Sequence, residues 1–108
     1  MFLSSAPKRF LAYSEPVDMR KSFAGLVSVV QNVLREDPLS ECVFIFFNRR
    51  GNYMKLVTWD RTGYCLFAKK LERGRFRLPT GERKQEISER AFRLILDGIV
   101  LGAYSGRT

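Results

Sequence analysis

The 108-residue sequence predicts a single small α+β domain, in which an antiparallel β-meander of about four or five strands packs against two α-helices. Two amphipathic segments flank a block of β-forming residues, and short turn clusters divide that block. Hydrophobic residues make up 45% of the chain, and no repeat, low-complexity tract or linker interrupts it. One domain over residues 1–108, with its core at about residues 10–100, is therefore expected.

The N-terminal part predicts a short strand followed by a helix. Residues 10–14 are β-forming and end before Pro16, since the residue preceding a proline avoids the helical conformation. Asp18 is the expected N-cap of a helix from about residue 19 to 35, which stops before Pro38. The expected buried face repeats at three- and four-residue spacing and consists of Phe23, Leu26, Val27, Val30, Val33 and Leu34.

The middle of the chain predicts the meander. Residues 43–47 are apolar on both faces, as in a central strand covered on both sides, and residues 53–59 and 64–70 form the next two strands. Short turn-forming clusters separate these strands, and connections of that length join antiparallel neighbours. Residues 76–79 are expected to add a short edge strand, because a proline is tolerated at an edge.

A second helix is expected after the meander. Ser88 is its predicted N-cap, and Ile87 and Phe92 are placed for a hydrophobic staple across its first turn. The helix is expected to end near Asp97, where Gly98 follows.

The composition excludes several kinds of chemistry. The chain has no histidine, which removes Ser-His and Cys-His nucleophiles and histidine metal ligands. Cys42 and Cys65 stand in apolar runs without a CxxC motif, which predicts free, buried, reduced thiols and no zinc site. The acidic residues stand at caps, turns and helix ends, and there is no P-loop. No catalytic residue, metal or cofactor is therefore expected.

The N-terminus has no secretory h-region, and no apolar run approaches the roughly 20 residues of a membrane span. These observations predict a cytoplasmic protein without a membrane partner.

The net charge of +8 is concentrated in one third of the chain. Residues 49–84 contain eleven basic and three acidic residues, whereas the remainder contains eight of each. Alternate turns of a meander lie at the same end of the sheet, so the turns at 48–52 and 72–75 are expected to meet there. The turn at Asp60 is expected at the opposite end. Such clustering produces a positive potential that attracts a polyanion.

Contact with DNA phosphates is the function that this charge favours, chiefly through the planar guanidinium of arginine. Tyr53, Tyr64 and Phe76 are expected near the same turns and offer rings for stacking on unpaired bases, although most aromatic residues of strands are core. Basic residues at solvated turns and edges also have a purely structural explanation. The candidate nucleic-acid-binding residues are Arg49, Arg50, Lys55, Lys69, Lys70, Arg73, Arg75 and Arg77.

Several uncommon strings occur in order along the chain. They are Val17-Asp-Met-Arg-Lys-Ser-Phe23, Phe47-Asn-Arg-Arg-Gly51, Lys55-Leu-Val-Thr-Trp-Asp60 and Lys70-Leu-Glu-Arg-Gly-Arg-Phe76. By these strings the chain resembles the small accessory protein, often called TnpB, that is encoded by the second open reading frame of insertion sequences of the sixty-six family. Ser22 stands where the family pattern has glycine.

The resemblance implies a role in bacterial DNA transposition, in which a separate, larger protein is the catalytic transposase. It brings no catalytic residues with it, so the protein is expected not to be an enzyme. Two functions remain open: binding of the element's ends, mainly through phosphate contacts, and docking of the transposase without direct DNA binding. Either function is compatible with a homodimer. The expected location is the bacterial cytoplasm, on the nucleoid when DNA is bound.

Overall fold

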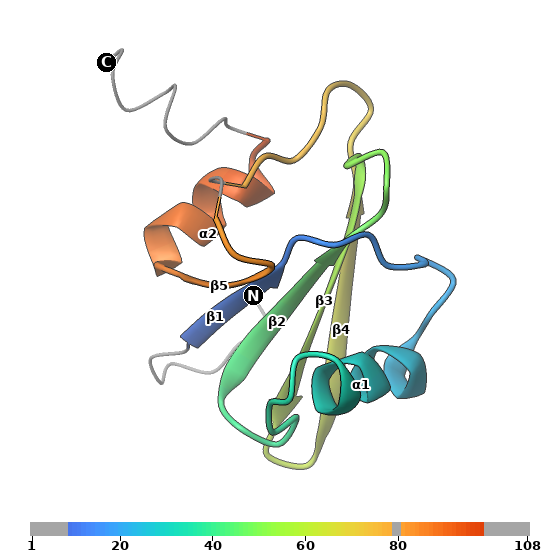
Figure 1. Ribbon diagram of the computed structural model, residues 1–108, viewed down its shortest axis with the longest axis vertical. Helices are drawn as coiled ribbons and strands as arrows, with labels where there is room; N and C mark the ends of the chain where they lie inside the picture. Colours follow the sequence, from blue (N-terminus) through green and yellow to red (C-terminus); the bar gives the residue numbers. More distant parts are fainter. Residues whose placement is uncertain (1–8, 79–80, 99–108) are drawn as a thin grey trace.

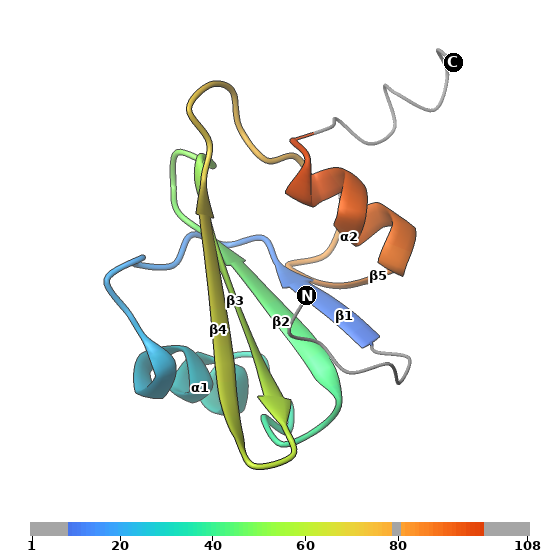
Figure 2. The ribbon, with the colours of Figure 1, turned by 180° about the vertical axis from the view of Figure 1, so that it is seen from behind.

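The computed structural model describes residues 9–78 and 81–98 and shows a five-stranded mixed sheet with one helix on each face (Figures 1 and 2). The predicted α+β class is confirmed. The strand order across the sheet is β4-β3-β2-β1-β5. The elements in chain order are β1 (Arg9–Tyr13), α1 (Phe23–Asn32), β2 (Cys42–Phe47), β3 (Tyr53–Asp60), β4 (Gly63–Lys70), β5 (Lys84–Ile87) and α2 (Glu89–Leu96).

The predicted antiparallel meander consists of β2, β3 and β4, in which Phe44 lies opposite Val57 and Trp59 lies opposite Tyr64. β1 lies outside the meander, because it pairs parallel to β2. A parallel pair cannot be closed by a tight turn, so the chain crosses one face of the sheet between β1 and β2, and α1 forms within that crossover.

The central strand β2 is buried along its whole length and separates two hydrophobic cores. One of its faces packs in a cluster with Leu26 and Val30 of α1. The other face packs in a cluster with Phe92 and Ile95 of α2. The continuous apolar run of β2 follows from this arrangement, since a strand covered on both faces has no solvent-facing positions.

The prediction that Asp18 caps the first helix is wrong. The α1 helix follows Ser22, which makes no side-chain cap hydrogen bond. The carboxylate of Asp18 instead accepts a hydrogen bond from the backbone N–H of Arg20 at 2.9 Å and pairs with the Arg20 guanidinium at 2.6 Å. These contacts lower the pKa of Asp18 to about 2. They also form a local turn at the position where the first turn of the helix was predicted.

The helix is also shorter than predicted, and part of its expected buried face is exposed. Leu26, Val30 and Leu34 are buried against the sheet at a spacing of four residues. Phe23 and Val33 are 45% and 53% exposed, because the sheet covers only a narrow stripe of this ten-residue helix.

The predicted edge strand at residues 76–79 is wrong. Residues 76–78 belong to an irregular loop, and Pro79 lies outside the described residues. The backbone N–H of Phe76 donates to the carbonyl of Gly51 at 2.7 Å, and its ring packs against Phe47 at a centroid distance of 5.8 Å. Burial of this large ring in the core beneath α2 decides the path of the loop.

The fifth strand is β5, which pairs antiparallel to β1 and was not expected from the sequence. Its four residues alternate between exposed and half-buried, a pattern too short and too polar to stand out. The second helix agrees with the prediction. The hydroxyl of Ser88 accepts the N–H of Ala91 at 3.0 Å, and Ile87 and Phe92 meet in one core as a staple requires.

Both cysteines are free thiols, as predicted, but only Cys42 is fully buried. It lies in the core beneath α1, whereas Cys65 on β4 is half-buried. Burial raises the pKa of the Cys42 thiol to about 12 from 9.0.

Stability should therefore fall at alkaline pH through Cys42. Below about pH 9 the thiol is neutral in both states, and between about pH 9 and 12 only the unfolded chain ionises it, which favours unfolding. The free energy of unfolding of the wild type should decrease faster with pH than that of Cys42→Ala, by up to about 1.4 kcal/mol per pH unit. Urea unfolding at several pH values measures this, and parallel curves for the two proteins would contradict it.

Candidate nucleic-acid interface

The loop between β2 and β3 and the loop after β4 lie side by side at one end of the sheet, at the top of Figure 1. The N–H of Leu71 donates to the carbonyl of Asn52 at 2.8 Å, and the N–H of Phe76 donates to that of Gly51 at 2.7 Å. A Cβ placed on Gly51 would lie 3.4 Å from the Cβ of Arg75. The predicted convergence of the two basic turns is confirmed, and the β3–β4 turn lies at the opposite end.

Asn48 fixes the shape of the first loop. Its Oδ1 accepts the backbone N–H of Asn52 at 3.0 Å, and its Nδ2 donates to the Oδ1 of Asn52 at 2.8 Å. Gly51 has a φ of +75°, a left-handed conformation that strains any residue with a Cβ. The resulting tight turn presents Arg49 and Arg50 to solvent.

The eight candidate residues divide into unpaired arginines and engaged lysines. Five guanidinium groups are exposed and have no hydrogen bond or ion pair with any described residue; they belong to Arg49, Arg50, Arg73, Arg75 and Arg77. The ammonium of Lys55 donates to the carbonyl of Lys21 at 2.8 Å, and that of Lys69 donates to the carbonyl of Leu96 at 2.6 Å. Lys70 is exposed and lies over the ring of Tyr53, 5.9 Å from its centroid.

Two lysines therefore stabilise ends of the helical segments. Lys69 supplies a cation at the C-terminus of α2, where the last carbonyls lack helical partners. Lys84 has the same role beyond α1, since its ammonium donates to the carbonyl of Leu34 at 3.0 Å and pairs with Glu36 at 2.5 Å. Sequence reasoning missed both roles, because each contact joins residues far apart in the chain and leaves no local pattern.

Of the three rings considered for base stacking, only that of Tyr53 both lies at the basic end and is partly exposed. The ammonium groups of Lys55 and Lys70 stand 6.0 and 5.9 Å from its centroid. The expectation that the other two rings are available for stacking on bases at this end is wrong. Tyr64 lies at the opposite end of β4, edge-to-face with Trp59 at 5.0 Å, and Phe76 is buried in the core.

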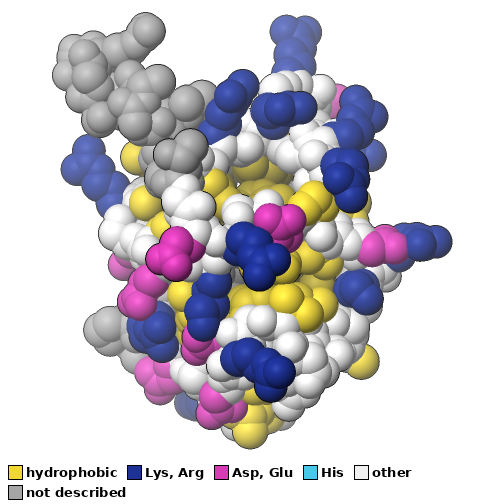
Figure 3. Space-filling view, viewed as in Figure 1, with side chains coloured by type: hydrophobic (Ala, Val, Ile, Leu, Met, Phe, Trp, Pro, Cys, Tyr) yellow, Lys and Arg dark blue, Asp and Glu magenta, His cyan; other side chains and the backbone are white. Residues whose placement is uncertain are grey.

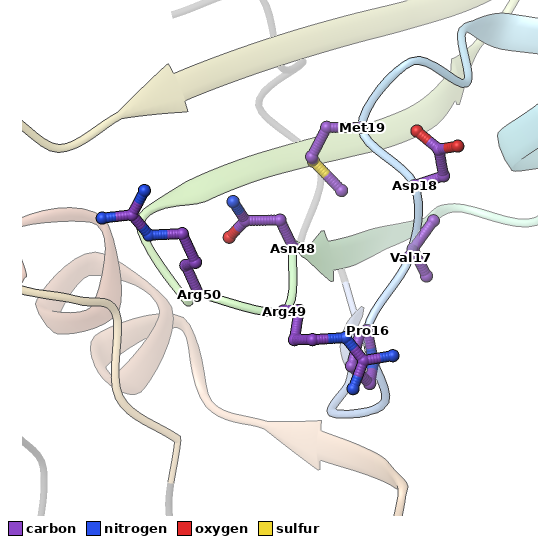
Figure 4. Close-up of a pocket in the computed structure, with 7 residues that line it drawn as sticks. All are labelled: Pro16, Val17, Asp18, Met19, Asn48, Arg49 and Arg50. Atoms are coloured by element: carbon purple, nitrogen blue, oxygen red, sulfur yellow. The ribbon is translucent and has the colours of Figure 1, made fainter.

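A pocket of about 460 Å³ adjoins this end of the molecule (Figure 4). Residues 16–19 of the loop between β1 and α1 form one wall, and residues 48–50 form the other. In the view of Figure 3, lysine and arginine side chains gather over the basic end. Among residues 9–78 and 81–98, no three metal-ligating side chains come together, and no helix is long and apolar enough to span a membrane.

The fold and this surface define a small basic α+β domain whose distinguishing feature is a cluster of exposed arginines, on two adjoining loops, that pair with no described residue. Residues 8–105 match the family described as IS66 Orf2 like protein, and the chain belongs to that family. Membership associates the chain with insertion sequences of this type.

Two uncharacterized proteins of Sinorhizobium fredii (strain NBRC 101917 / NGR234) are similar to the chain. Protein y4hO is 45% identical over 65 residues, which cover 60% of this chain and 56% of y4hO. Protein y4jC is 32% identical over 92 residues, which cover 84% of this chain and 79% of y4jC. The chain thus spans little more than half the length of y4hO. No solved structure matches the chain.

The division between arginines and lysines predicts different effects on stability. Lys69→Met should lower the free energy of unfolding by about 1–2 kcal/mol, because it removes a charged hydrogen bond at the C-terminus of α2. Lys70→Met removes the same charge from the next residue and should cost less than about 1 kcal/mol, since it loses only an exposed contact with a ring. Urea unfolding of both variants tests this, and equal losses would contradict the assigned role of Lys69.

Proposed function

We propose that the protein is a non-catalytic accessory of transposition that binds the DNA of the element's ends through the arginines of its two adjoining loops. The observation that carries this proposal is the convergence of five exposed arginines, none of them paired with a described residue. A guanidinium engaged in an ion pair must give up that partner before it binds a phosphate, whereas an unpaired one does not. A cluster of exposed cations of this kind produces a positive potential that attracts a polyanion such as DNA.

The position of these arginines favours contacts with the backbone over base reading. They stand on loops at the end of a sheet, and neither helix carries them. Phosphate contacts set the position of a protein on DNA without reading its sequence. We therefore expect the protein to bind the ends of the element through charge and shape, with sequence choice left to the transposase.

Salt dependence tests the proposal. Fluorescence anisotropy with duplex terminal-repeat DNA should give a log–log slope against salt of about −0.9 for each phosphate neutralised. The double variant Arg73→Gln, Arg75→Gln should bind more weakly and lower the magnitude of this slope by about 2.

The matched control is Arg61→Gln, because Arg61 is an exposed arginine in the β3–β4 turn at the opposite end of the sheet. This variant should bind as the wild type does. Absence of binding by the wild type at low salt, or an equal loss in the control, would refute the assignment to this surface.

The outer edge of β4 favours a second function, docking of the transposase. β4 lies at one side of the sheet, and its segment Tyr64–Ala68 carries no charge. The N–H of Leu71 donates to Asn52 across the ladder, so by alternation the backbone groups of Leu66 and Ala68 point away from β3. Within the described part of the chain, no strand pairs with them. We propose that an extended apolar segment of the transposase adds a strand here.

Ala68→Pro tests the docking proposal, because proline removes the outward N–H of an exposed residue and leaves the ladder to β3 intact. Co-purification with the transposase should be lost in Ala68→Pro and kept in the control Ala68→Val. If Ala68→Pro still co-purified with the transposase, strand addition would be contradicted. If the wild type formed a homodimer that Ala68→Pro converted to a monomer, the β4 edge would bind a second copy of the chain. That result would also contradict docking of the transposase.

A further inference from the structure

Two of the strings by which the chain resembles its family meet at the pocket beside the basic loops. Residues 17–23 and 47–51 are far apart in the sequence, yet residues 16–19 and 48–50 form its two walls (Figure 4). The backbone N–H of Val17 donates to the carbonyl of Phe47 at 2.8 Å and fixes the two segments side by side. The pocket is thus a built feature of the fold and not a gap between loosely placed loops.

Each wall is held in shape independently. In the first wall, Asp18 closes on Arg20, and the ammonium of Lys55 donates to the carbonyl of Lys21 at 2.8 Å just beyond it. The second wall is the turn that Asn48 fixes through its two hydrogen bonds with Asn52. A preformed pocket of this kind loses little conformational freedom when a ligand enters it.

The walls combine apolar side chains with positive charge that no described residue pairs. Val17 and Met19 are apolar, and Figure 4 shows the thioether of Met19 pointing toward Asn48. In the same view, the side chain of Arg49 extends toward the side of the picture where Pro16 lies, and both residues line the pocket. The one acidic lining residue, Asp18, is paired with Arg20, so it does not offset the charge of Arg49 and Arg50. The six residues other than Asp18 are Pro16, Val17, Met19, Asn48, Arg49 and Arg50.

We infer that this pocket binds one unpaired nucleotide of single-stranded DNA, with the base against Met19 and Pro16 and its phosphate on Arg49. This inference rests on the proposed DNA-binding function and names the form of DNA that the site prefers. Planar rings pack favourably on thioether and guanidinium groups. In a nucleotide the base and the phosphate are joined through one deoxyribose, so both can reach the same site. A base inside a duplex is stacked and paired, so it cannot enter a pocket without being extruded.

An acidic peptide is the competing ligand for a pocket with two arginines. Its carboxylates would satisfy Arg49 and Arg50, but they would leave the exposed ring of Pro16 and the half-buried side chain of Met19 uncovered. A nucleotide satisfies both parts of the site at once. The observations therefore favour single-stranded DNA.

The experiment compares three oligomers of equal length: oligothymidylate, the same backbone with abasic sites, and a duplex. The abasic oligomer retains every phosphate and removes every base. Wild-type protein should bind oligothymidylate about tenfold more tightly than the abasic oligomer. Met19→Ala should reduce binding of oligothymidylate about fivefold and leave the abasic oligomer and the duplex unchanged. Met19→Leu, which keeps an apolar side chain, should behave as the wild type, and thermal unfolding of all variants checks that they are folded.

The outcomes separate this inference from the proposed function. Equal binding of oligothymidylate and the abasic oligomer, unaffected by Met19→Ala, overturns the nucleotide pocket, while the loss of duplex binding in Arg73→Gln, Arg75→Gln would still support phosphate contact. Competition by a polyglutamate peptide as effective as that by oligothymidylate also overturns it. Absence of binding to all three oligomers overturns the proposed function itself.

Discussion

Burial of β2 on both faces is the constraint on which the rest of the structure depends. A strand that is apolar along its whole length must be covered on two sides, and within residues 9–78 and 81–98 the helices α1 and α2 provide this cover. The parallel pairing of β1 with β2 sends α1 across one face, and the antiparallel return through β5 leads into α2 on the other. The ring of Phe76, from the loop after β4, packs in the same core as α2 and helps to cover that face of β2.

The basic groups at one end of the sheet are of two kinds. At one end, the lysines satisfy backbone carbonyls that the short helical segments leave open, as Lys69 does for α2. The arginines of the adjoining loops form no hydrogen bond or ion pair with any described residue. The same excess of charge therefore has two physical uses: one stabilises the fold, and the other is available to a partner.

A contact between separated segments creates the candidate nucleotide pocket. The loop before α1 is irregular because Asp18 pairs with Arg20 in place of capping the helix, and the turn after β2 is tight because Asn48 and Gly51 shape it. The hydrogen bond from Val17 to Phe47 joins them. Loops held on a rigid sheet in this way place side chains accurately without a regular element of their own.

The sequence by itself determined the elements with a strong local pattern and the location of the charge. The meander, the cap of α2 at Ser88 and the excess of arginine between Arg49 and Arg77 follow from periodicity, turn chemistry and composition, which are local properties. Only the tertiary structure decided what depends on distant partners: the parallel pairing of β1, the short charged strand β5 and the burial of Phe76. It also decided which basic groups are engaged. A lysine that caps a carbonyl 27 residues away and an arginine left unpaired are indistinguishable in sequence, because the difference lies in the packing that brings a carbonyl within reach.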